Sequence, residues 1–355
     1  MYVALKVGAI GGLRLSGFVC TCLMASQSFA QDDPLFATNE PLAITIEMPM
    51  DIVVRNADEK PVVDGVLRYE DDDGTEVSIE LTMTTRGRSR LEYCRFPPLK
   101  INLKKKQTEG TLFASQNKLK IVTHCRKGSL HERYLRQEFG IYKAYNELSD
   151  FSFRVRWLTV TYTDSAGERD DMVHDAFFIE SNREVGKRHG RERVMDNRIA
   201  LAALDPVEST RYTLFQYLIA NTDWSMLKGP GDEGCCHNGK ILREPGSTQG
   251  WVVLPYDFDQ AGLINTSYSI PAEGLKIRSV RTRLYRGRCL HNGQLADTIA
   301  QFNESRLALE SHLAPAELSD SKRNYALKYV DKFFETINDP KKKQRELYEA
   351  CLGGH

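Results

Sequence analysis

The sequence lacks net charge, internal repeats and low-complexity segments. Beyond its first 30 residues it also lacks any apolar run long enough to cross a membrane. Among its 355 residues, 48 Lys and Arg balance 48 Asp and Glu, so the formal charge is zero. General binders of nucleic acid or of anionic membranes need a clear excess of basic residues. The apolar fraction of 41% and the charged fraction of 27% are ordinary for a folded soluble protein. We therefore expect a globular protein with no nucleic-acid partner and no transmembrane segment.

The first 30 residues are typical of a removable export signal. Lys6 and Arg14 precede a short apolar run, and Ser28 and Ala30 are small residues at the positions that a signal peptidase recognises. The apolar run is shorter than the roughly 20 residues that span a bilayer. We expect residues 1–30 to be a signal peptide and the mature protein to be exported, either to a periplasm or out of the cell.

Cysteine is scarce, and the even number beyond the expected signal peptide favours disulfides in an exported chain. These residues are Cys94, Cys125, Cys235, Cys236, Cys289 and Cys351. Cys235 and Cys236 are adjacent, so we expect each to bond a distant cysteine and thereby to pin their loop. A zinc site that includes His237 is the alternative, although structural zinc sites prefer cysteines separated by a few residues.

Hydrophobic periodicity divides the chain into a β-rich part and a mainly helical part. Alternating residues predict strands in "LAITIEM", "GVLRYED", "EVSIELTMTTRG" and "PLKINLKK", and later in "FRVRWLTVTYTD" and "DMVHDAFFIES". Between these groups, apolar residues at helical spacing predict one long helix that begins near Gly128, with Glu138 on its apolar stripe. Beyond residue 295 the chain is mostly helical. We therefore expect an α+β protein with a β-rich lobe over residues 31–182 and a helical lobe over residues 183–355.

Three polar side chains are predicted to meet at the mouth of one hairpin. Asn238 opens the strand "NGKIL" and Asp257 follows the strand "GWVVLP", so antiparallel pairing would bring them side by side. Asp223 lies upstream, just after a helix that Asp205 and Pro206 are expected to open. Carboxylate and amide oxygens are hard ligands that suit magnesium or manganese. A base together with metal-binding Asn and Asp residues is the arrangement that phosphoryl transfer uses.

Glycoside hydrolysis is an alternative for paired carboxylates. The aromatic residues near this hairpin that could stack on a sugar are limited to Trp251, Tyr256 and Tyr268. We therefore favour phosphoryl transfer over sugar chemistry.

The order of Asp223, His237-Asn238 and "WVVLPYDFD" resembles the catalytic and metal-binding segments of the atypical kinase-like CotH family. HipA-type and secreted Golgi kinases are more distant relatives of that family. Upstream, "TTRGRSRLEYCRFPPLKINL", "LRQEFGIYKAYNEL" and "DAFFIES" are similar to further segments of the family pattern. The resemblance covers roughly residues 80 to 262. It implies a bilobal protein-kinase-like fold that uses ATP with magnesium or manganese to transfer a phosphoryl or nucleotidyl group to an exported protein.

Carried over by position, the resemblance makes Asp223 the catalytic base. Asn238 and Asp257 would hold the metal, with Asp259 as a further residue of the metal site. Lys100 would contact the nucleotide phosphates and pair with Glu138, although Lys118 and Lys120 are alternatives for that role. The remaining residues expected near the nucleotide are Arg86, Gly87 and Ser89 at its edge and Glu180 at the hinge between lobes.

The chain departs from the kinase pattern at three points. The segment between Asp223 and Asn238 is longer than in ordinary kinases, Trp224 directly follows Asp223, and Asp259 stands where a glycine is usual. These departures support an alternative in which the protein is a catalytically inactive binding or assembly module of the cell envelope.

Overall fold

The computed structural model describes residues 1–4, 33–229 and 235–353. The predicted signal peptide, apart from its first four residues, lies outside this part of the chain. Residues Asp32–His355 form one compact unit. Within the described residues, no helix combines the length and the apolar character that a membrane crossing requires.

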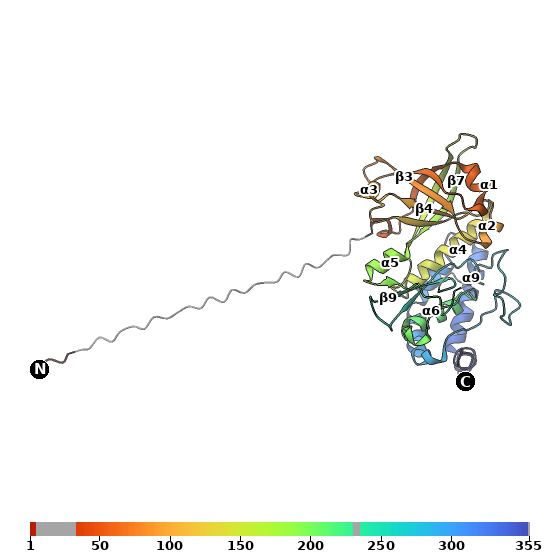
Figure 1. Ribbon diagram of the computed structural model, residues 1–355. Coiled ribbons are helices and arrows are strands. Elements are labelled where there is room, and N and C mark those ends of the chain that lie inside the picture. The colour runs from red at the N-terminus through yellow and green to blue at the C-terminus, as the bar shows by residue number, and fades with distance from the viewer. Residues whose placement is uncertain (5–32, 230–234, 354–355) are drawn as a thin grey trace. The chain divides into compact units, whose positions relative to one another are not determined.

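Seven strands close into a barrel in the order β1-β2-β3-β4-β5-β7-β6. Their bounds are β1 Leu42–Met48, β2 Val63–Glu70, β3 Glu76–Thr85, β4 Leu99–Leu103, β5 Lys118–Val122, β6 Val155–Asp164 and β7 Met172–Ile179. Six neighbouring pairs are antiparallel, whereas β1 and β6 pair in parallel, with Leu42 opposite Leu158. This parallel pair joins the first strand to a much later one and leaves the sheet without a free edge. The barrel strands lie together at the top of Figure 1.

The prediction of a bilobal protein-kinase-like fold is wrong. The structure is a closed mixed barrel of seven strands combined with helices. The predicted strand segments are present as β1 to β4, β6 and β7, whereas β5 was not predicted, and all seven strands close into one sheet. Strand patterns are local signals, whereas the pairing of β1 with β6 depends on contacts between residues far apart in the chain.

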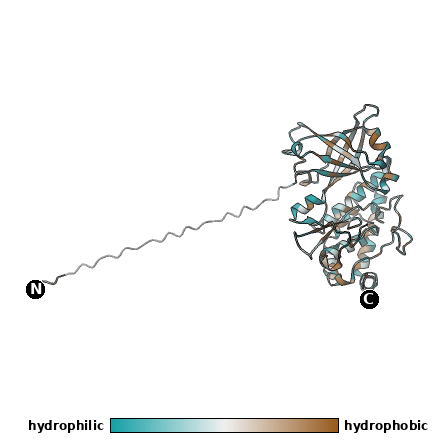
Figure 2. Cartoon of the chain, viewed as in Figure 1, coloured by the Kyte–Doolittle hydropathy of each residue, from teal (hydrophilic) through white to brown (hydrophobic). Residues whose placement is uncertain are grey.

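Alternation along the strands fills the barrel with apolar side chains. Ile44 and Ile46 on β1, Ile101 on β4, Ile121 on β5 and Phe178 on β7 are fully or almost fully buried. Successive side chains of a strand point to opposite faces, so the residues between them face outward. Figure 2 shows hydrophobic segments on these strands beside hydrophilic loops. Three short helices accompany the barrel: α1 Met50–Arg55, α2 Ser89–Tyr93 and α3 Lys105–Thr108.

The long helix α4 (Ser129–Asn146) packs against the outside of the barrel, as its apolar stripe predicts. Phe139 meets Trp157 of β6 and Phe177 of β7 in edge-to-face contacts, with ring centroids 5.2 and 5.6 Å apart. On its other side α4 crosses α8 (Arg306–Leu313) so closely that a Cβ at Gly140 would collide with the carbonyl oxygen of His312. The helix therefore connects the barrel to the helical part of the protein (Figure 1).

A small sheet and the remaining helices complete the unit. The sheet has the order β10-β9-β8, with β8 Glu192–Arg193, β9 Gly239–Arg243 and β10 Val252–Pro255. The helices are α5 Asn182–Arg188, α6 Pro206–Leu218, α7 Leu295–Glu304, α8, α9 Asp320–Asn338 and α10 Pro340–Lys343. Short 3-10 turns lie at η1 Pro34–Phe36, η2 Ala57–Glu59, η3 Leu201–Ala203 and η4 Cys289–Gln294, and a π-helical turn at η5 Gln344–Tyr348. The predicted cap of α6 is present, since the Asp205 carboxylate accepts a hydrogen bond from the Glu208 N–H at 2.8 Å.

Three cysteine pairs lie at disulfide distance: Cys94 with Cys125, Cys235 with Cys236, and Cys289 with Cys351. The prediction that Cys235 and Cys236 bond distant partners is wrong, because these neighbours pair with each other. Cys94 and Cys125 join the end of α2 to the loop before α4, and so hold two segments next to the site described below.

Candidate functional site

The hairpin of β9 and β10 brings its two ends together as its sequence predicts. Gly239 pairs with Pro255, and the Tyr256 N–H donates to the Asn238 carbonyl at 3.1 Å. Asn238 and Asp257, which flank these strands, both have left-handed backbones, with φ of 48° and 61°. Asn and Asp are the residue types that tolerate this conformation best after glycine. Both residues therefore lie at the same end of the hairpin, which we call the hairpin mouth.

Asp223 is held at this mouth by its neighbours. The Asn238 amide donates to the Asp223 carbonyl at 2.7 Å and to its carboxylate Oδ2 at 2.9 Å. His237 Nε2 lies 2.6 Å from Asp223 Oδ1, and the Asp223 N–H donates to Asn221 Oδ1 at 3.0 Å. The hydrogen bond that Asp223 accepts from His237 raises the pKa of His237 above its ordinary value, although partial burial opposes the shift. The Asp223 side chain remains 31% exposed, so it can meet a ligand.

Asp257 lies between this mouth and the barrel. Its N–H donates to Tyr142 Oη on α4 at 3.1 Å, which fixes its backbone, and its side chain is 34% exposed. Its carboxylate lies 4.0 Å from the Arg90 guanidinium. The charge of Asp257 adds to the rise in the pKa of His237 on one side, and on the other side it partly opposes the lowering of the pKa of Lys120. Asp257 is thus within electrostatic range of both the hairpin mouth and strand β5.

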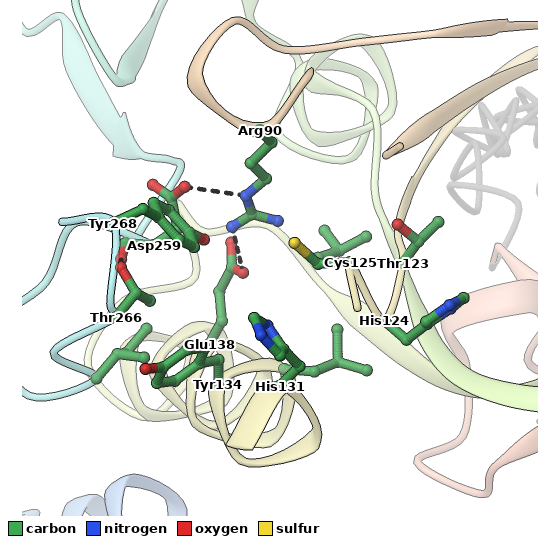
Figure 3. Close-up of a pocket in the computed structure, with 13 residues that line it drawn as sticks. Arg90, Thr123, His124, Cys125, His131, Tyr134, Glu138, Asp259, Thr266 and Tyr268 are labelled. Atoms are coloured by element: carbon green, nitrogen blue, oxygen red, sulfur yellow. Dashed lines mark hydrogen bonds and ion pairs between the residues drawn. The ribbon is translucent and has the colours of Figure 1, made fainter. Parts of the chain in front are cut away.

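A buried ion cluster supports the site from behind (Figure 3). Arg90 of α2 donates from Nη2 to Glu138 Oε2 at 2.5 Å and from Nε to Asp259 Oδ2 at 2.9 Å. The three side chains are only 10%, 5% and 7% exposed. Burial raises the pKa of both carboxyl groups, and the Arg90 charge opposes that rise. The Arg90 guanidinium therefore forms ion pairs with two buried carboxylates, and the cluster joins α2, α4 and the segment after β10.

Three cations surround the buried ring of Tyr256. Lys120 Nζ lies 3.9 Å from the ring centroid, Lys240 Nζ lies 5.7 Å from it, and the Arg86 guanidinium carbon lies 5.8 Å from it. Arg86 also donates a hydrogen bond to Tyr256 Oη. Burial, followed by the charges of Arg86 and Lys240, lowers the pKa of Lys120 well below its usual range. Among the described groups that act most strongly on Lys120, Asp257 is the carboxylate, and its charge partly opposes this lowering of the pKa.

The structure brings Asp223, Asn238, Asp257, Asp259, Arg86 and Glu138 into this region, whereas Lys100 and Glu180 have other surroundings. Lys100 is exposed on the outer side of β4, beside Lys120 in the sheet, and the cation paired with Glu138 is Arg90. The Asp259 carboxylate bonds to Arg90 and so supports the site from behind.

Of the remaining expected residues, Gly87 and Ser89 are exposed at the start of α2. Glu180 is fully buried and paired with Arg154 at 3.0 Å and Arg188 at 3.1 Å, which makes it part of an internal network between β7 and α5.

Sequence reasoning missed Arg90, Tyr142 and His237 as parts of the site, and it ranked Lys120 behind Lys100. The signal for Arg90 was present, because a glutamate on an apolar helical stripe requires a buried cation. That cation was sought on a strand, whereas it lies on the short helix α2. Lys120 lies next to the ring of Tyr256, and this contact could not be recognised without the fold.

Asp257 and Asn238 are the side chains that could hold a divalent metal here. Within the described ranges there is no group of three or more His, Cys, Asp or Glu residues arranged to hold an ion. Magnesium commonly binds through one or two protein carboxylates and completes its shell with water and substrate phosphates. A half-exposed carboxylate at the same hairpin end as an amide side chain fits that pattern, whereas Cys235 and Cys236 are bonded to each other and do not fit a zinc site.

No protein-family model matches the chain, and no curated protein sequence matches it at a significant level. The resemblance to the CotH-like family stays a prediction based on the quoted motifs.

Proposed function

We propose that this protein is exported, binds a nucleoside triphosphate with magnesium or manganese at the hairpin mouth, and transfers a phosphoryl or nucleotidyl group to a hydroxyl of an exported protein. The observation that carries the proposal is the meeting of an acidic and amide mouth with a cluster of cations. Asp223, Asn238 and Asp257 form the mouth, and Arg86 and Lys120 belong to the cation cluster.

The cation cluster provides the phosphate-binding part of the proposed site. Lys120, Lys240 and Arg86 converge on Tyr256 from a barrel strand, the hairpin and the segment before α2. A phosphate group beside Lys120 would place a negative charge next to its amine and so favour the charged form of Lys120. Lys120 thus takes the role that sequence reasoning gave first to Lys100.

The acidic mouth provides the chemical groups of the proposed reaction. In phosphoryl transfer, the acceptor oxygen forms a bond to the terminal phosphorus, the bond to the bridging oxygen breaks, and the nucleoside diphosphate leaves. Asp223 would orient the acceptor hydroxyl and take its proton, while Asn238 and Asp257 would hold the metal. A bound metal would neutralise charge on the phosphates. Positioning and charge neutralisation are the main contributions of a protein to this chemistry.

Nucleotide binding without transfer is the second candidate. Both oxygens of the Asp223 carboxylate are already engaged, one by His237 and one by Asn238. The Asp259 carboxylate is committed to Arg90 and unavailable to a metal. A protein with this arrangement could use the site for assembly on the cell envelope instead of for turnover.

Labelled ATP with manganese, added to the protein without its signal peptide, tests both candidates by intact mass and thermal denaturation. We expect a covalent mass increase that is lost in Asp223→Asn, and a nucleotide-dependent stabilisation that is lost in Lys120→Met. A ligand at about 100 times its dissociation constant stabilises by about 2.7 kcal/mol, which is easily measured. Lys118→Met is the matched control, because Lys118 lies on the same strand and is exposed. Stabilisation without a mass change supports the second candidate, and the absence of both contradicts the proposed site.

A further inference from the structure

A cavity of about 450 Å³ lies beside the Cys94–Cys125 disulfide, where α1 and the loop before α4 meet. Its lining residues are Val54, Arg95, Phe96, His124, Cys125, Arg126, Lys127, His131, Arg169 and Met172, and we call it the basic pocket. Its volume is within the range of roughly 300–1,000 Å³ that is usual for small-molecule sites. None of the lining residues belongs to the cation cluster or the hairpin mouth.

The charges of the basic pocket are of one sign. No carboxylate is among its lining residues, and only Arg169 has an acidic partner, Asp51, among the described residues. Arg126 donates through Nε and Nη2 to the Tyr93 carbonyl, at 2.8 and 2.5 Å, and so has a neutral partner. Arg95 and Lys127 are exposed and form no ion pair within the described part of the chain. The pocket therefore presents several cations without internal counter-charges.

His124 adds a buried polar group to the wall of this pocket. Its side chain is 5% exposed, and its Nδ1 is buried without a hydrogen-bond partner within the described residues. The ring stacks on His174, with centroids 3.7 Å apart, and on Phe96 at 4.9 Å. In Figure 3 it extends away from Arg90 and the carboxylates of the ion cluster. Burial, followed by the charge of His174, lowers the pKa of His124 to about 3, so the ring is neutral at pH 7 and can donate one hydrogen bond.

The other part of the wall is apolar. Val54 of α1, Phe96 before β4 and Met172 at the start of β7 line the same cavity. A pocket with a few polar groups and an apolar surface is the usual form of a site for a small organic ligand. A purely inorganic anion would leave this apolar surface in contact with water.

We propose that the basic pocket binds a small amphipathic anion, with a phosphate or carboxylate group bound by Arg95, Arg126 and Lys127. The apolar part of the ligand contacts Val54, Phe96 and Met172, and His124 donates a hydrogen bond to it or to its anionic group. This site is distinct from the proposed nucleotide site, since none of its lining residues belongs to the hairpin mouth or the cation cluster, although His124, Cys125 and His131 also line the cavity beside the ion cluster.

Titration calorimetry of the whole mature protein tests this proposal with hexyl phosphate, hexanoate, inorganic phosphate and neutral hexanol as probes. We expect the hexyl anions to bind more tightly than inorganic phosphate and than hexanol. Removing both exposed cations in Arg95→Gln with Lys127→Gln weakens binding by about tenfold or more, because charge-assisted hydrogen bonds are lost. Lys322→Gln, at an exposed lysine of α9, is the control and leaves binding unchanged.

Two further variants separate this site from the nucleotide site and from a general charge effect. Val54→Phe fills the pocket and keeps its charges, so it weakens binding of hexyl phosphate while the charge of the protein is unchanged. Lys120→Met leaves that binding unaltered. A preference for hexyl phosphate over hexanoate identifies a phosphate ligand, and the reverse identifies a carboxylate. Equal binding of hexanol, or binding that survives both the charge and the filling variants, overturns the proposal.

Discussion

Replacing Arg90 by methionine should destabilise the protein strongly, because it leaves two buried carboxyl groups without their cation. The Arg90 side chain is 10% exposed and bonds Glu138 at 2.5 Å and Asp259 at 2.9 Å. Breaking a buried ion pair by removing one partner typically costs about 3–5 kcal/mol. We expect a loss in this range at neutral pH, which is a large part of the stability of an ordinary protein.

The loss should become smaller as the pH falls. Burial raises the pKa of Glu138 and Asp259, and without Arg90 nothing of comparable strength opposes that rise. A carboxyl group whose folded pKa is above its unfolded value of about 4 stabilises the folded state fully below that value. This stabilisation is lost as the pH rises through the folded pKa. In the variant, both groups therefore favour the folded protein in acid and disfavour it at neutral pH.

Urea denaturation at about pH 7.5 and about pH 5 measures both effects. Arg306→Met is the matched control, since Arg306 also pairs with two carboxylates, Glu310 at 2.6 Å and Asp331 at 2.7 Å. Those groups are on the surface, where such pairs contribute at most about 1 kcal/mol. The reasoning is refuted if Arg90→Met costs no more than Arg306→Met, or if its deficit is the same at both pH values. Adding Glu138→Gln to Arg90→Met should restore part of the stability.

Three further predictions concern packing, capping and titration. Gly140→Ala should destabilise by about 3 kcal/mol or more in thermal denaturation, because backbone blocks the new methyl group, whereas Gly293→Ala enters open space and should be neutral. Asp205→Ala should cost about 1 kcal/mol as a lost helix cap, whereas Ser319→Ala should cost little, since that side chain makes no capping bond. An NMR titration should give His237 a pKa above its usual value, and Asp223→Asn should lower that pKa. The stabilisation from this pair is fully present below about pH 6.5 and disappears as the pH rises through the folded pKa of His237.

Local patterns predicted most of the elements but not their arrangement. The alternation in residues 42–48 and 155–164 indicates two strands, and both are present as β1 and β6. Nothing in either stretch indicates that they pair in parallel, because that pairing is decided by the whole sheet. The resemblance to a kinase-like family then suggested an incorrect fold.

The candidate site was predictable in part, for reasons that differ between its residues. The mouth formed by Asn238 and Asp257 follows from a hairpin, which is a local structure with a clear signal. The choice between Lys100 and Lys120 depends on which one the rest of the protein covers, although the two lie opposite each other in the sheet. The partner of Glu138 depends on where the short helix α2 lies, which the sequence around Arg90 does not indicate.

The parallel pairing of β1 with β6 has a consequence for synthesis of the protein. As the chain leaves the ribosome, β1 can pair with β2 early, but its other edge stays uncovered until residues 155–164 have emerged. An uncovered strand edge is a template for pairing with other chains. Until β6 has been synthesised, this edge of β1 is therefore open to pairing with other chains.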